Sequence, residues 1–336
     1  MPTPTLTAEA LGRLIAAAEP GRRATVTGLR PITGGYSRLS AVADVRWDDG
    51  AAERLVLRGD PPPGEGVFDS DRDAEWELLQ ALAASGAVPV ARPRWYDATG
   101  EHLGTKCIVV DHVAGRNLQE VLRTAEDPAA PAGTFVDAVA AVHAVPLDTL
   151  PAGMTRPASW DDYLDGVLDL YRDVDREIAD SSPVLRYVAA RLRGHRPPPV
   201  PFTLVHGDCQ PTNVLVRDPA VGGHVVIDWE FARIGDPRED LGYYTQIPMQ
   251  PNAYTADPAG FLARYRERTG LTEEQVNPAT VEYFLVVGMA RLLVQILRAL
   301  DAVAAGGTRG VMATYLVNAV THQYGLYLDV AREVAS

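Results

Sequence analysis

The first third of the chain alternates apolar and polar residues in short runs, the pattern of β-strands that bury one face. Strand-like runs cover residues 24–31, 40–47 and 54–58, and a later hairpin ends in the apolar run 107–110. Turn-forming residues separate the first three runs, with a Gly-Gly pair after the first and Asp-Asp-Gly after the second. The pattern predicts an antiparallel sheet.

Helical periodicity accounts for most of the remaining chain. It appears in 7–18, with Thr7 as the expected N-cap, in 71–84, and along the chain from 117 onward. The long apolar stretch 283–300 carries two arginines and a glutamine, so we expect a buried helix there rather than a membrane span. Together with the sheet, these helices predict an α+β protein.

Composition narrows the class of protein. A chain of 336 residues with 46% apolar residues can bury a core in two lobes. Its net charge of −13 argues against a nucleic-acid partner, which needs clustered Lys and Arg. With only two cysteines, a disulfide framework or a thiolate zinc site is excluded. Without a leader-like segment, we expect a cytoplasmic protein with no membrane partner; no feature selects an oligomeric state.

The candidate site lies in two apolar runs joined by a polar loop. Leu-Val-His-Gly-Asp-Cys-Gln-Pro-Thr-Asn-Val-Leu-Val at 204–216 is followed by Val-Val-Ile-Asp-Trp at 225–229. Phosphoryl transfer needs a carboxylate to orient the attacking hydroxyl and accept its proton, and oxygen ligands to hold Mg²⁺. Asp208 suits the first role. Asn213, five residues later, and Asp228, at the end of the second strand, suit the second role.

A simpler interpretation is a loop between two buried strands, since Asp and Asn both suit turns. Turn chemistry does not require two carboxylates and an amide at matching distances from two strands, so we favour the catalytic interpretation. His206 is interpreted as a structural residue that hydrogen-bonds the backbone beneath the loop. Cys209 is interpreted as a small loop residue, because no histidine can be placed beside it.

These residues also resemble a known group of proteins. His-Gly-Asp at 206–208, Asn213 and Ile-Asp at 227–228 resemble the catalytic and metal-binding segments of the aminoglycoside phosphotransferase and choline kinase group, relatives of the protein kinases. Gly-Asp-Pro-Arg-Glu-Asp-Leu at 235–241 resembles the stretch that helps hold the catalytic loop in place in that group. The likeness runs from residue 30 to residue 241.

The resemblance implies a bilobal, protein-kinase-like α+β fold. Residues 1–112 would form an N-terminal nucleotide-binding lobe, an antiparallel sheet with a helix. Residues 113–336 would form a mainly helical C-terminal lobe that carries the catalytic loop and the substrate site. The resemblance also implies ATP and Mg²⁺ as cofactors.

Further residues are implied for the nucleotide. They are Gly34, Gly35 and Ser37 over the phosphates, Arg58 with Glu75 beside the phosphates, and the backbone of Asp111 and Val113 at the adenine. Arg58 stands where most of the group has a lysine. An arginine keeps the charge and can pair bidentately with a carboxylate, so it can take the same role with altered geometry. Glu75 is the proposed partner of Arg58, and Glu77 is the alternative.

The sequence pattern indicates the substrate contacts less clearly than the catalytic residues. Trp229 and Glu230 directly follow Asp228 and are favoured for the substrate pocket, whereas Tyr243 and Tyr244 are favoured as core residues. The arginine at position 58 and the Pro-rich segment after it look like the branch of the group related to the kinase domains fused to some acyl-CoA dehydrogenases. That likeness argues against assuming an antibiotic substrate.

The sequence therefore predicts transfer of a γ-phosphoryl group, most simply from ATP, to a hydroxyl of a small molecule. An aminoglycoside-like antibiotic, a choline-like compound, a sugar and a hydroxyacyl compound all remain open as acceptors, as does GTP as donor. The rival from another class is a catalytically silent, kinase-like nucleotide-binding module, which Arg58 and the reduced Gly loop would suit. We favour the enzyme because Asp208, Asn213 and Asp228 are all present.

Overall fold

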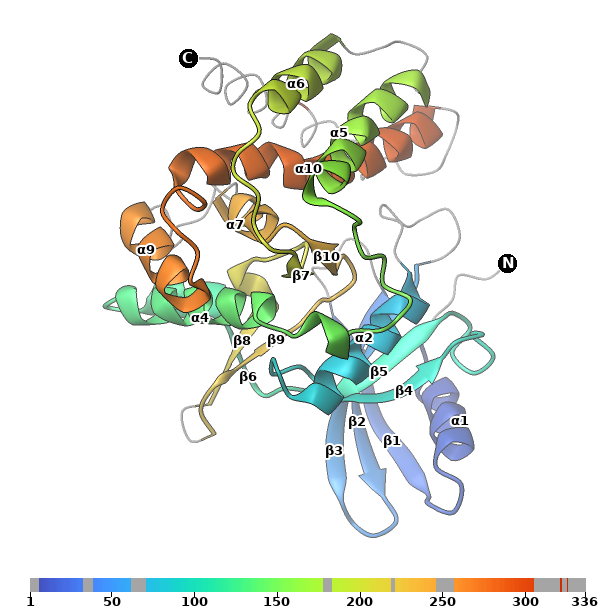
Figure 1. The fold of residues 1–336 in the computed structure, drawn as a ribbon. Helices are drawn as coiled ribbons and strands as arrows, with labels where there is room; N and C mark the ends of the chain where they lie inside the picture. The colour runs from blue at the N-terminus through green and yellow to red at the C-terminus, as the bar shows by residue number, and fades with distance from the viewer. Residues whose placement is uncertain are drawn as a thin grey trace. The chain divides into compact units, whose positions relative to one another are not determined.

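The structure is a computed structural model, and the part that we describe comprises residues 6–32, 39–61, 71–177, 183–218, 221–245, 257–304, Thr321 and Gly325. The chain divides into two compact units, Met1–Ala114 and Gly115–Ser336. This division lies two residues beyond the predicted one. The elements confirm the predicted α+β class, with a five-stranded sheet in the first unit and mostly helices in the second (Figure 1).

The first unit is built on one antiparallel sheet with the strand order β1-β2-β3-β5-β4. Its strands are β1 (Ala24–Pro31), β2 (Leu39–Trp47), β3 (Ala52–Gly59), β4 (Pro93–Asp97) and β5 (Cys107–Asp111). The four predicted runs all lie within these strands. Their alternation is visible in β2, where every second residue from Ala41 to Trp47 is buried.

Two helices, α1 (Ala8–Ala18) and α2 (Arg72–Ser85), pack on this sheet. As predicted, the Thr7 hydroxyl caps α1, where it accepts a hydrogen bond from the Ala10 amide at 3.1 Å. The apolar face of α1 packs with Leu55 and Leu57 of β3. Because neighbouring side chains of a strand point to opposite faces, Arg58 lies on the other face, where it meets α2.

The second unit is a helical body with two small sheets. Its helices are α3 (Leu118–Thr124), α4 (Ala129–His143), η1 (Leu147–Thr149), α5 (Trp160–Glu177), α6 (Pro183–Gly194), η2 (Pro211–Asn213), α7 (Arg238–Thr245), α9 (Pro258–Thr269) and α10 (Pro278–Ala304). Strands β6 (Gly115–Asn117), β8 (Val214–Arg217) and β9 (His224–Val226) form one sheet, and β7 (Thr203–Val205) pairs with β10 (Arg233–Gly235).

One hydrophobic core of the second unit lies among α5, α6 and α10. Tyr171 donates its hydroxyl to the Val286 carbonyl, and Tyr283 donates to the Leu192 carbonyl, so both buried phenols are satisfied. Helix α10 is long and apolar enough to span a membrane by length and composition, and an 18-residue window within Pro278–Asp301 has a mean hydropathy of 1.7. Of that window, 62% is buried inside the protein, which agrees with the predicted buried helix.

Candidate active site

Strand pairing brings two of the three predicted catalytic residues together. Asn213 directly precedes β8, and Asp228 follows the end of β9 by two residues. The two strands are antiparallel, with Val214 opposite Val226, and the Ile227 amide donates to the Asn213 carbonyl at 2.9 Å. Asn213 and Asp228 therefore lie at the same end of this strand pair.

Asp208 lies in the loop that follows β7, and amide groups fix its side chain. The Asn213 side-chain amide donates to Asp208 Oδ2 at 2.7 Å and to the Asp208 carbonyl at 2.9 Å, and Gln210 donates to Oδ1 at 2.9 Å. The carboxylate is only partly buried. Because Asn213 turns its Nδ2 toward Asp208, its Oδ1 faces the other way and can serve as an oxygen ligand.

His206 has the structural role predicted for it. Its Nδ1 accepts a hydrogen bond from the Asp208 amide at 3.3 Å, so Nε2 carries the proton and donates to the Ile227 carbonyl at 2.9 Å. The imidazole thus ties the loop to the residue before Asp228. Burial raises the pKa of the Cys209 thiol, which agrees with the interpretation of Cys209 as an unreactive loop residue.

Asp228 has a backbone conformation that is unusual for its residue type. Its φ is +71°, and it is the only non-glycine residue with a positive φ in the described part of the chain. This left-handed conformation is uncommon outside glycine, and aspartate and asparagine tolerate it better than most residues. Such backbone outliers cluster at functional sites.

The substrate role predicted for Trp229 does not fit its position. The side chain is 2% exposed, packs at 4.8 Å between ring centroids on His206, and donates from Nε1 to the Val226 carbonyl at 3.2 Å. Trp229 is therefore a packing residue beneath the loop. Its neighbour Glu230 is partly exposed and remains a predicted substrate contact.

A buried carboxylate, Asp240 of α7, anchors the predicted catalytic loop. Its Oδ2 accepts from the His206 amide at 2.8 Å and its Oδ1 from the Gly207 amide at 2.9 Å. Burial would raise the pKa of Asp240, but hydrogen bonds from the His143 side chain and the His206 backbone outweigh it and lower the pKa. Asp240 thus does what the resemblance implied for the segment 235–241.

Two residues that sequence reasoning missed complete this anchor. His143, at the end of α4, contacts Asp240 Oδ2 through Nε2 at 3.0 Å and the Tyr265 hydroxyl through Nδ1 at 2.7 Å. Both are buried. His143 lies 97 residues from Asp240 and 122 residues from Tyr265 along the chain, so no local spacing in the sequence indicates these contacts.

Asp240→Asn should lower the free energy of unfolding by about 3 kcal/mol, because an amide cannot replace a buried, paired carboxylate that accepts from two backbone amides. Denaturant unfolding measures the change. Asp257→Asn is a matched control, since Asp257 is an exposed N-cap of α9 and asparagine caps a helix equally well. An equal loss in the two variants would contradict the anchoring role of Asp240.

In the first unit, Arg58 and Glu75 are neighbours as predicted, but the contact is long. Arg58 Nη2 lies 3.8 Å from Glu75 Oε1, whereas Arg72 Nη1 lies 2.5 Å from Glu75 Oε2. The alternative partner, Glu77, is exposed, so the structure favours Glu75. The pairing of a buried Arg72 with Glu75 was not predicted from the sequence, in which Arg72 is one of several charged residues at the start of a helix.

The other residues implied for the nucleotide are also in the first unit. The Asp111 carboxylate pairs with Arg94 at 2.8 Å, and its amide donates to the Arg92 carbonyl at 2.9 Å. An adenine contact through the backbone of Asp111 and Val113 stays a prediction. Residues Gly34, Gly35 and Ser37 lie outside the described residues.

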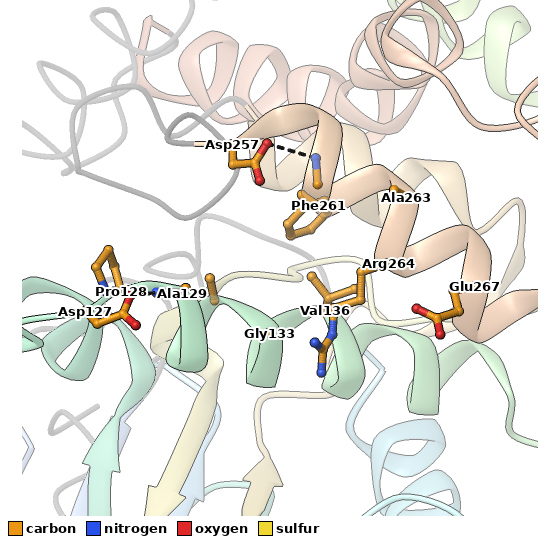
Figure 2. Close-up of a pocket in the computed structure, with 12 residues that line it drawn as sticks. Asp127, Pro128, Ala129, Gly133, Val136, Asp257, Phe261, Ala263, Arg264 and Glu267 are labelled. Atoms are coloured by element: carbon orange, nitrogen blue, oxygen red, sulfur yellow. Dashed lines mark hydrogen bonds between the residues drawn. The ribbon is translucent and has the colours of Figure 1, made fainter.

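A cavity of about 590 Å³ lies between α4 and α9 (Figure 2). Its lining includes Val136, Phe261 and Arg264, and the Arg264 guanidinium pairs with Asp137. A Cβ at Gly133 would come within 3.1 Å of that guanidinium, so glycine leaves the room that the arginine occupies. None of the predicted site residues lines this cavity.

Comparison with known proteins now gives the family. The model of the phosphotransferase enzyme family matches residues 28–280, which is most of the chain, so the chain belongs to the phosphotransferase enzyme family. This confirms the resemblance found in the sequence. Membership of this family supports phosphoryl transfer as the reaction class.

The curated relatives are much longer than this chain. Acyl-CoA dehydrogenase family member 11 of Gallus gallus is 25% identical over 198 residues, and that of Rattus norvegicus is 25% identical over 233 residues. The matches cover 58% and 67% of this chain but 25% and 29% of the relatives. The chain therefore matches less than a third of their length.

Solved structures with the same fold cover nearly the whole chain. A Ralstonia eutropha protein assigned to the aminoglycoside phosphotransferases has a TM-score of 0.69 at 19% identity, covering 98% of this chain and 99% of its own. Choline kinase from Streptococcus pneumoniae has a TM-score of 0.61 at 14% identity, covering 94% and 97%. These likenesses confirm the kinase-like fold.

Proposed function

We propose that this protein transfers the γ-phosphoryl group of ATP to a hydroxyl group of a small molecule. The observation that carries the proposal is the constellation in the second unit. A carboxylate is fixed by amides at Asp208, with Asn213 and Asp228 at one end of a strand pair. Family membership supports the reaction class.

Asp208 is the residue proposed to orient the acceptor. Its carboxylate is partly exposed and cannot rotate freely, because Asn213 and Gln210 each hold one oxygen. It can accept a hydrogen bond from the attacking hydroxyl and take its proton as the new O–P bond forms. Fixing the hydroxyl in line with the phosphoryl group supplies much of the catalysis in such reactions.

The residues present suit Mg²⁺, which proteins usually hold together with phosphates and water, better than a metal that is bound by side chains alone. Among the described residues, no group of three or more His, Cys, Asp or Glu side chains could hold a metal ion. Mg²⁺ is usually bound through one or two protein oxygens, with phosphates and water completing its shell, and Asn213 and Asp228 offer that donor set. The bound ion would neutralise charge on the phosphates.

The nucleotide donor is proposed from the relatives and from Arg58. Similar solved structures are complexes with AMP, GDP or ADP. In this chain, Arg58 offers a mostly buried cation on β3 that would compensate phosphate charge. We propose ATP as the donor, and GTP is the comparison to measure.

The test is release of nucleoside diphosphate with Mg²⁺ and a panel of acceptors. The panel contains aminoglycosides, choline-like compounds, sugars and hydroxyacyl compounds, each with ATP and with GTP. A compound that accelerates ADP release at least tenfold in the wild type, and not in Asp208→Asn, would support the proposal. Tight Mg²⁺·ATP binding with no turnover on any panel compound would favour a silent nucleotide-binding module instead.

Arg58→Ala should raise the KM for ATP and lower kcat, because a fixed cation is lost from the ground state and the transition state. Arg58→Lys should be tolerated better, since the charge remains. Steady-state kinetics at saturating acceptor measure both parameters. ATP kinetics near wild type in the alanine variant would remove Arg58 from the proposed site.

A further inference from the structure

Four charged side chains form a cluster between β3 and α2, within the first unit. They are Arg58 and Asp60 at the end of the strand and Arg72 and Glu75 at the start of the helix. The side chains of Arg72 and Glu75 are 0% and 2% exposed. A buried charge is stable only when it is paired, so this arrangement is specific rather than incidental.

Arg72 is the centre of the cluster. Its Nη1 donates to Glu75 Oε2 at 2.5 Å, while its Nε and Nη2 donate to Asp60 Oδ1 at 3.1 and 2.9 Å. One planar guanidinium therefore joins the strand end to the helix. A planar guanidinium can donate to two carboxylates in a fixed geometry, which a lysine ammonium does not provide.

Arg58 approaches the same carboxylate from its other oxygen. The 3.8 Å between Arg58 Nη2 and Glu75 Oε1 is an ion-pair distance but is too long for a hydrogen bond. The Arg58 side chain is 14% exposed, whereas that of Arg72 is fully buried. Arg72 thus makes the direct bond to Glu75, and Arg58 remains at a distance with part of its surface accessible.

We propose that Arg72 is a positioning residue for nucleotide binding. It occupies Glu75, so that this carboxylate attracts Arg58 without binding it directly, and the Arg58 guanidinium stays directed at the phosphates. This inference rests on the proposed function, in which Arg58 contacts the nucleotide. It also gives a physical reason why an arginine can serve at position 58. The ion pair of Arg72 with Asp60 holds helix α2 to the end of β3, so Arg58 is not needed for that contact.

The inference predicts what happens when Arg72 is removed. A buried Glu75 left with a single cation would draw Arg58 into direct contact, since an unpaired buried carboxylate is costly. Arg58 would then be held by the helix and lost to the phosphates. Asp60 is 30% exposed, so water can replace its lost partner.

The experiment measures Mg²⁺·ATP affinity by isothermal titration for the full chain. Arg72→Met should weaken binding at least about fivefold, within the range of coupling between contacting groups. Adding Glu75→Gln to that variant should restore most of the affinity, because the residue that captures Arg58 is removed. If Arg72 only supported the fold, the double variant would bind as weakly as the single one or more weakly, and the inference would fail.

Two further variants make the result specific. Lys106→Met removes another ion pair between α2 and the sheet, Lys106 with Asp73 at 2.6 Å, which is exposed and does not involve Glu75. It should leave affinity unchanged. If Arg72→Met does not fold, Arg72→Lys takes its place, since it keeps a charge but lacks the planar guanidinium that holds both carboxylates in a fixed geometry. It should also weaken binding, with rescue by Glu75→Gln.

The two levels of proposal fail in different ways. Wild-type protein that does not bind Mg²⁺·ATP, or an Arg58→Ala variant that binds it normally, would overturn the phosphate role of Arg58. An impaired Arg58→Ala variant together with normal binding by Arg72→Met would leave that role standing and overturn the inference about Arg72. A crystal structure of Arg72→Met should show direct contact between Arg58 and Glu75.

Discussion

Asp208→Asn should lower kcat by about 10²–10⁴-fold, the usual effect of removing a positioned base. The amide keeps the shape of the side chain, but it accepts no proton from the attacking hydroxyl. Affinity for Mg²⁺·ATP should stay close to wild type, because Asp208 is proposed to face the acceptor and not the nucleotide. Turnover measured by nucleoside diphosphate release, together with titration of the nucleotide, separates the two effects.

Gln210→Ala is a matched control for this result. It removes one amide donor from the Asp208 carboxylate without removing the carboxylate, so a smaller loss of kcat is expected than in Asp208→Asn. A kcat near wild type in Asp208→Asn would end the assignment of this site.

Asp228→Ala should abolish Mg²⁺-dependent nucleotide binding. A carboxylate that holds the metal against the phosphates compensates much of their charge, so binding should fail and not only the chemical step. Isothermal titration with ATP, with and without Mg²⁺, measures this. Affinity that is unchanged in the presence of Mg²⁺ would show that the end of β9 is not the metal site.

The backbone at Asp228 calls for a second variant. Alanine is less suited than aspartate to the left-handed conformation at φ +71°, so the alanine variant changes both charge and strain. Asp228→Asn keeps a residue that tolerates this conformation and removes only the charge. Loss of Mg²⁺-dependent binding in both variants would assign the effect to the carboxylate.

Patterns of hydrophobic residues were sufficient to predict most strands and both helices of the first unit. The strands β1, β2 and β3 could be placed because each buries one face, and their alternation is a local property of the chain. The start of α1 could be placed because the capping hydroxyl of Thr7 is also local. The order of the strands was not predicted, since pairing between distant segments leaves no trace in local periodicity. The predicted division after residue 112 came from the resemblance, and it lies two residues before the observed one at Ala114.

The site could be predicted only where its residues are close in sequence or follow a strand end. Asp208, Asn213 and Asp228 met that condition. His143 and Arg72 did not, because burial decides their roles and an isolated charged residue usually reads as exposed. The prediction that Trp229 contacts the substrate was wrong, because a position next to the site in sequence does not determine which way a side chain points. The Trp229 side chain points inward and packs on His206.

The left-handed backbone at Asp228 carries a consequence for how this protein can evolve. Glycine adopts such a conformation without steric cost, so a glycine there would relieve local strain. The chain instead keeps an aspartate, whose carboxylate is the proposed metal ligand. Position 228 is thus a place where selection for a more stable protein and selection for an active one favour different residues, a trade-off confined to a single side chain.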